Sequence, residues 1–224
     1  MKKAVFFLLI FFTLGCPLFS QSHVSESWLS FGAGYGNSFE QFSRENTRFR
    51  SYVASPGFIF GGYRFFDNSN LGIFADGFFA VPVRDSLGNS DKSDVGFQTG
   101  LIIGPGYRIA LSDRLAFRAT AGLTLFLASF VYSEHDPAHG TVEYETMSID
   151  FGPAADIGFR YRIGRAVFLS AGSIFTANFG RLMWMDATFK EMQTQKSSIG
   201  WERNFFSFGI RPYITVGFNL LYIW

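Results

Sequence analysis

The feature that most constrains this chain is an alternation of apolar residues with small or polar ones, sustained over long segments. It runs through residues 95–110, 115–132 and 147–163, where almost every second residue is apolar. Many of the intervening positions hold glycine, threonine, arginine or aspartate. Because side chains alternate across a strand, each segment predicts a β-strand with one apolar face and one small or polar face.

The character of the two faces indicates which one points inward. A soluble sandwich buries its apolar face, whereas a membrane barrel turns that face to lipid. The strands predicted here are much longer than the roughly five or six residues usual in soluble sheets. Their polar faces are rich in glycine rather than in lysine and glutamate. We therefore expect phenylalanine, leucine and valine to face lipid, and arginine, aspartate and glycine to face the barrel axis.

The alternation predicts an all-β chain that forms an eight-stranded antiparallel transmembrane β-barrel, connected as an up-and-down meander. The sheet has to close, because an open edge in hydrocarbon would leave backbone groups without hydrogen bonds. Short turns are expected at the periplasmic end and long polar loops at the extracellular end. The expected strands are 26–36, 52–66, 71–83, 94–110, 114–133, 146–163, 166–180 and 203–224, with turns at 67–70, 111–113 and 164–165 and loops at 37–51, 84–93, 134–145 and 181–202.

The first residues have the pattern of an export signal. Two lysines precede a mostly apolar run over residues 5–16, which is too short to span a bilayer as a helix. Residues 1–22 are therefore expected to be a signal peptide, and residues 23–224 the outer-membrane β-barrel domain. Lipidation of Cys16 is left open as an alternative to simple cleavage. Export of such a barrel places it in the outer membrane of a diderm bacterium.

Composition excludes several other classes of protein. With 48% hydrophobic and 17% charged residues, the chain is not intrinsically disordered. A formal net charge of +1 gives no reason to expect a nucleic-acid partner. The single cysteine excludes a disulfide framework and a cysteine-built zinc site, and we expect no cofactor.

Aromatic residues near the expected strand ends predict girdles at the two membrane interfaces. In the second expected strand, Gly61 and Gly62 are expected to form a β-bulge. The bulge would turn Tyr63 and Phe65 toward lipid and Arg64 toward the axis. Outer-membrane lipid is thus the first expected partner.

The end of the sequence resembles the recognition signal of barrels inserted by the outer-membrane assembly machinery. Apolar residues alternate with other residues up to a terminal aromatic side chain. The resemblance implies that the assembly machinery is a second partner. The residues that carry it are Phe218, Leu220, Tyr222 and Trp224.

The chain resembles the small eight-stranded outer-membrane proteins. This is the group of the OmpA transmembrane domain, OmpX and OmpW. The resemblance rests on this C-terminal signal, on the alternating strands and on the order in which short turns and long loops follow each other. The resemblance implies a closed barrel, with known roles in membrane anchoring, in adhesion or defence against host factors, and in passage of small, often hydrophobic molecules. Fold does not fix function, so the resemblance alone does not choose among these roles.

The inward face carries charged side chains, most of them toward the periplasmic half. Because an isolated buried ion is very costly, we expect a salt-bridge network that fills and rigidifies the lumen. A basic constriction that selects small anions is the alternative, and inward glycines such as Gly100 and Gly106 would leave room for water-filled pockets. The residues of the expected network are Arg64, Asp76, Arg108, Arg118, Asp150, Asp156, Arg160, Arg162 and Arg211.

The fourth long loop contains a candidate apolar patch. Four of its apolar residues have helix-like spacing, which predicts a stripe that either caps the barrel rim or contacts a ligand, lipid or partner. Trp184 lies within the same segment. The patch comprises Leu182, Trp184, Met185, Phe189 and Met192.

The three histidines of the chain bear on whether the protein is an enzyme. Barrel enzymes such as PagP, PagL and the omptins use a histidine held at the barrel surface or rim. Here His23 lies near the expected cleavage site, while His135 and His139 lie in a polar loop with Asp136 and Glu143. We therefore expect a solvated loop rather than a weak metal site or a catalytic group.

These patterns predict a non-enzymatic integral outer-membrane β-barrel protein. The leading hypothesis is restricted passage of small solutes through a charged, constricted lumen. The alternative is a surface adhesin or interaction protein that binds host surface molecules through its four extracellular loops. In that case the lumen would be a salt-bridged plug.

Overall fold

The computed structural model describes residues 26–44, 47–66, 70–87, 95–136, 140–189, 194–202 and 204–220. Eleven β-strands form one sheet over these residues, and among them no helix is long and apolar enough to cross a bilayer. The expected signal peptide lies outside the described part. The strands are β1 (Glu26–Arg44), β2 (Thr47–Phe65), β3 (Leu71–Ala80), β4 (Arg84–Leu87), β5 (Val95–Ala110), β6 (Leu115–Asp136), β7 (Gly140–Arg162), β8 (Val167–Asn178), β9 (Gly180–Phe189), β10 (Thr194–Trp201) and β11 (Phe206–Asn219).

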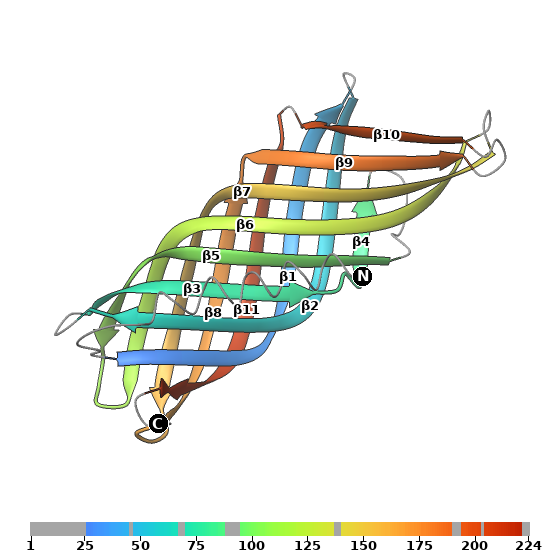
Figure 1. The fold of residues 1–224 in the computed structure, drawn as a ribbon. Coiled ribbons are helices and arrows are strands. Elements are labelled where there is room, and N and C mark those ends of the chain that lie inside the picture. Colours follow the sequence, from blue (N-terminus) through green and yellow to red (C-terminus); the bar gives the residue numbers. More distant parts are fainter. Residues whose placement is uncertain are drawn as a thin grey trace.

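Eight of these strands close into the predicted antiparallel meander barrel (Figure 1). They are β1, β2, β3, β5, β6, β7, β8 and β11, and each pairs with its neighbours in chain order. Closure comes from the pairing of β1 with β11, which runs from Trp28 opposite Asn219 to Gln41 opposite Phe206. The expected fold class is therefore confirmed.

Two tight turns lie at one end of the barrel, which we call the short-turn end. In residues 111–114 the amides of Leu111 and Ser112 donate to the carbonyl of Leu115 at 2.9 and 3.0 Å. In residues 163–166 the amide of Ile163 donates to the carbonyl of Val167 at 3.0 Å. Serine, aspartate and glycine supply the turn chemistry at these places, as the sequence predicts.

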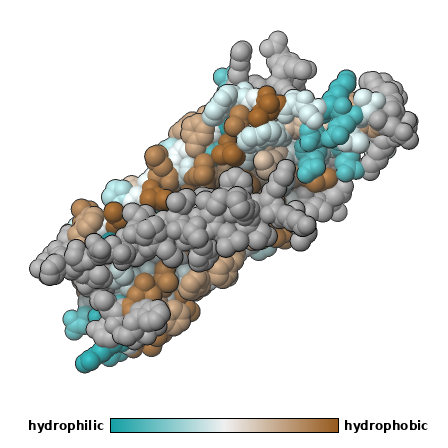
Figure 2. All heavy atoms as spheres, in the orientation of Figure 1, coloured by the Kyte–Doolittle hydropathy of each residue, from teal (hydrophilic) through white to brown (hydrophobic). Residues whose placement is uncertain are grey.

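The barrel is apolar outside, and its buried charged side chains point inward between layers of buried apolar ones. Along β11 exposed and buried residues alternate without interruption, and Ile214 on the outer face is 67% exposed. Asp150 and Asp156 on the inner face are fully buried. Figure 2 shows hydrophobic residues across the middle of the visible face and hydrophilic ones near both ends. Such an arrangement is stable only with hydrocarbon around the barrel, which confirms the predicted orientation of the two faces.

The prediction that four long segments form loops is wrong, because each of them contains residues in β-strands. β1 and β2 pair out to Arg44 opposite Thr47, and β6 and β7 pair out to Asp136 opposite Gly140. β4 adds to β2, and β9 and β10 form a hairpin within the fourth segment. Beyond the lipid, both faces of a strand meet water. The backbone hydrogen bonds between the strands continue there, but the sequence no longer alternates between apolar and polar residues.

The sheet divides at the end opposite the short turns, which we call the hairpin end. β9 continues the line of β8 along β7, after a one-residue bulge around Phe179. β10 then pairs with β9 alone and ends the strand order. In Figure 1, β5, β6, β7, β9 and β10 extend to the right, whereas β1, β2 and β4 rise toward the top.

Candidate functional site

Nearest the short turns, the lumen is filled by aromatic rings. Trp28, Tyr63, Phe65, Phe74 and Phe168 form one cluster, and each is at most 2% exposed. The rings of Tyr63 and Phe74 stack at 5.2 Å, and those of Trp28 and Phe168 meet edge to face at 4.6 Å.

The position of these rings overturns the expected bulge in β2. The registers of β2 with β1 and with β3 run without interruption through Gly61 and Gly62. Tyr63 and Phe65 therefore face the axis instead of lipid. Arg64 has the opposite parity and lies beside the exposed Ile73, outside the lumen. The prediction fails because it places these aromatic residues in the membrane girdle, whereas a narrow barrel also uses aromatic rings to fill its interior.

Toward the middle of the barrel, the next layer is an ion-pair network. The Arg118 guanidinium donates to the Asp156 carboxylate and lies 3.7 Å from an Asp76 oxygen. The Tyr213 hydroxyl accepts from Arg118 at 2.7 Å and donates to Asp156 at 2.9 Å. Four strands contribute to this layer, so it ties opposite walls of the barrel together.

An apolar layer with one arginine follows. Ile59, Phe78, Ile102 and Phe126 belong to a buried cluster that crosses the lumen. Arg211 stacks on the Phe78 ring at 4.2 Å and donates to the carbonyl and the hydroxyl of Ser55, each at 3.0 Å.

The layer nearest the hairpin end is a second ion-pair network. Arg181 donates to both oxygens of Asp150 at 2.7 Å, and to a Glu40 oxygen at 2.9 Å. Its guanidinium also lies 4.0 Å from the Phe205 ring. The sequence prediction included Asp150 but missed Glu40 and Arg181, because both fall in segments assigned to loops. Glu40 has the same parity as the small residues Ser30, Gly32 and Gly34 in β1, and this signal would have found it.

The remaining predicted lumen residues line the short-turn mouth. Arg160 lies 4.1 Å from the Tyr63 ring and 4.5 Å from the Phe168 ring. Arg108 lies 4.1 Å from the Phe65 ring, and Arg162 is exposed at the end of β7. With the deeper layers, the structure thus brings Asp76, Arg118 and Asp156 together, and holds Asp150 and Arg211 in separate layers.

Three of the inward glycines accommodate aromatic rings rather than open space. A Cβ at Gly100 would lie 2.6 Å from the Phe78 ring. A Cβ at Gly106 would collide with the Phe74 ring, and one at Gly217 with the Phe168 ring. The room that these glycines leave is therefore taken by neighbouring phenylalanines.

The predicted apolar stripe of the fourth loop is wrong, because the segment is strand. Leu182 and Trp184 lie opposite Ile149 and Met147 on the outer face, while Met185 has the parity of the inward Arg181. Phe189 shares that inner parity, and Met192 lies outside the described residues. A period of two separates residues that a helix would have placed on one side.

The expected C-terminal signal and the histidines are only partly within the described residues. In the expected C-terminal signal, Phe218 is an exposed residue of β11 and Leu220 follows it, but Tyr222 and Trp224 lie outside the described part. His135 is paired with Thr141 in the β6–β7 hairpin, whereas His23 and His139 are not described. Among described residues, no three histidine, cysteine or acidic side chains form a metal-binding group.

The comparisons with known proteins support the fold. No family model and no curated protein matches the chain. The outer membrane protein OprG from Pseudomonas aeruginosa matches with a TM-score of 0.56 at 8% identity, covering 89% of this chain and 98% of that one. Neisserial surface protein A gives a TM-score of 0.49 at 14% identity, with coverages of 87% and 99%. Ail of Yersinia pestis gives 0.43 at 11% identity, with coverages of 88% and 100%. Together with the closure of eight strands, the match to OprG shows that the chain has the fold of a small outer-membrane β-barrel.

Proposed function

We propose that this protein is a non-enzymatic outer-membrane protein that binds a partner through its hairpin end, while its lumen serves as a packed core. The short turns would face the periplasm and the hairpins the outside of the cell. The observation that carries the proposal is the succession of aromatic, ionic, apolar and ionic layers across the lumen. Side chains barely fit inside an eight-stranded barrel, so four occupied layers leave little room for a solute.

The edge strand β10 is the part of the hairpin end best suited to binding. All eight of its residues are exposed, and it pairs with β9 alone. An edge strand presents backbone donors and acceptors to which an extended segment of another protein can add. Ile199 and Trp201 are 63% and 64% exposed, and a cavity of about 100 Å³ lies beside them. An extended peptide segment of a surface protein is therefore the proposed kind of partner.

A shortened hairpin tests the binding role. Replacing residues 183–200 by Asn-Gly joins Leu182 to Trp201, which are opposite each other in the sheet, and retains Arg181. Peptides selected from a random library on the wild-type protein in nanodiscs are expected to lose most of their affinity for this variant. Equal affinity for both proteins would place the binding surface elsewhere, and failure to select any peptide would count against the proposal.

Conductance separates this role from the restricted passage that the sequence also suggests. In planar bilayers we expect the wild-type protein to give no steady single-channel steps, because each lumen layer blocks the axis. Steady steps that change in size when Arg160 is replaced by glutamine would favour passage and reject the packed-core proposal.

A further inference from the structure

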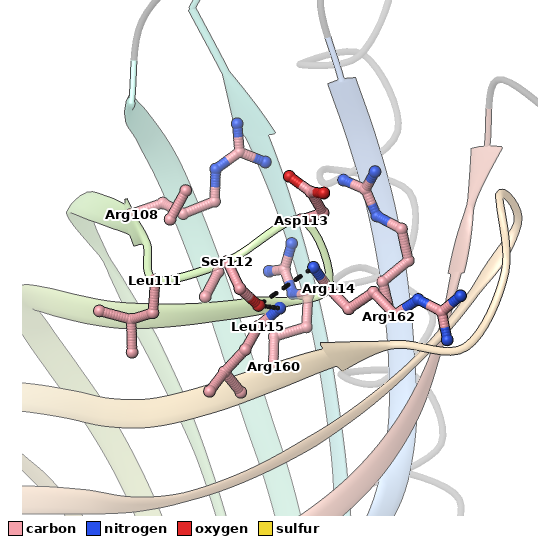
Figure 3. A pocket seen from close by; sticks show the side chains of 10 residues that line it. Arg108, Leu111, Ser112, Asp113, Arg114, Leu115, Arg160 and Arg162 are labelled. Carbon is pink, nitrogen blue, oxygen red and sulfur yellow. Dashed lines mark hydrogen bonds between the residues drawn. The ribbon is translucent and has the colours of Figure 1, made fainter.

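We propose that the mouth of the barrel at the short-turn end binds a phosphate group. A pocket of about 410 Å³ opens there, between the ends of β5, β6 and β7 and the turn at residues 111–114 (Figure 3). Among its lining residues Asp113 is the one carboxylate. Four arginines line it, namely Arg108 from β5, Arg114 from the turn, and Arg160 and Arg162 from β7.

The backbone fixes these arginines near one another. The amide of Arg162 donates to the carbonyl of Arg114 at 2.7 Å, which joins the end of β7 to the turn. Within the turn, the Ser112 hydroxyl accepts from the amides of Arg114 and Leu115 at 3.4 and 3.1 Å. These hydrogen bonds hold the backbones of Arg114 and Arg162 side by side at the rim of the pocket.

Aromatic rings orient two of the guanidinium groups. Arg160 is 6% exposed and lies against the rings of Tyr63 and Phe168, and Arg108 lies over Phe65. Contact with a ring restricts the positions that a guanidinium can take, so the rings hold these two cations at the mouth.

The charge and shape of the pocket favour phosphate. The carboxylates of Asp76 and Asp156, which contact Arg118, lie deeper in the barrel, and the residues that line the pocket include four arginines and one carboxylate. Guanidinium forks match oxyanions that offer several oxygens, and a phosphate group carries one or two negative charges on at least two free oxygens. The volume exceeds one phosphate and admits its substituent. Free phosphate and the headgroup of a phospholipid share this chemistry.

A double variant tests the site in the full-length folded protein. Arg108→Gln with Arg162→Gln removes two lining charges while leaving Arg118 and Arg160 in place. Arg165→Gln is the matched control, because Arg165 is exposed in the neighbouring turn and does not line the pocket. Heat-dependent gel migration establishes that each variant is folded before binding is measured.

Two measurements distinguish the sources of the phosphate. Calorimetry in a phosphate-free glycoside detergent measures binding of inorganic phosphate, and native mass spectrometry measures phosphatidylglycerol retained after extraction from vesicles. Binding in the first arm identifies a soluble ligand, and binding in the second identifies a headgroup. In either arm the double variant is expected to bind about tenfold or more weakly than the wild type and Arg165→Gln. Absence of binding in both arms, or equal binding by the double variant, would overturn the proposal.

Discussion

At the scale of single residues, the interior of this barrel depends on charges that are paired. Replacing Arg118 by alanine would leave Asp76 and Asp156 buried without their guanidinium partner. We expect a loss of about 3–5 kcal/mol in the free energy of unfolding, as is usual when one partner of a buried pair is removed. Urea titration in detergent, followed by tryptophan fluorescence, measures this loss. Arg165→Ala is the control at an exposed turn, and equal midpoints for the two variants would contradict the expectation.

A second prediction at the residue scale concerns the fit of a ring against a glycine. Leucine at Gly100 would place its Cβ against the Phe78 ring, so Gly100→Leu is expected to cost about 1–3 kcal/mol through overpacking. Phe78→Ala is destabilising on its own, but in the same chain it removes the ring, so the double variant should lose less than the sum of the two single losses. The same urea titration measures both variants. If the double variant loses at least as much free energy of unfolding as the two single variants together, the ring is not the obstacle.

At the scale of elements, the β9–β10 hairpin is expected to be dispensable for folding. The eight barrel strands pair without it, and the variant lacking residues 183–200 retains the contact of Arg181 with Asp150 and Glu40. Its circular dichroism spectrum and its unfolding midpoint should stay close to those of the wild type. A large fall in the midpoint would show that the hairpin is part of the barrel's core.

The elements also show what the sequence alone could and could not predict. Strands in contact with lipid were predicted well, because hydrocarbon requires an apolar outer face at every second residue. The extension of β1 to Arg44 and the strands β9 and β10 were missed, since water on both faces permits any polar sequence. Glu40 and Arg181 were missed for the same reason, because they lie in these segments. In β2 the parity of Tyr63 was misassigned, because an aromatic ring suits a narrow lumen as well as a membrane interface.

At the scale of the whole molecule, closure of the sheet predicts resistance to detergent. The eight barrel strands themselves leave no open edge at which unfolding can begin, so the unboiled protein is expected to migrate differently from the boiled one in sodium dodecyl sulfate gels. A chain truncated before Phe206 lacks β11 and serves as the control that should migrate alike under both conditions. Identical migration of the full-length protein before and after boiling would argue against a closed sheet.

The pairing of β1 with β11 has a consequence for biogenesis. The first strand of the barrel pairs with the last one, so until β11 has been made one edge of β1 has no permanent hydrogen-bonding partner. A nascent chain of this protein is thus exposed to aggregation for most of its synthesis. It follows that a late nonsense mutation, which removes β11, should be as damaging as an early one.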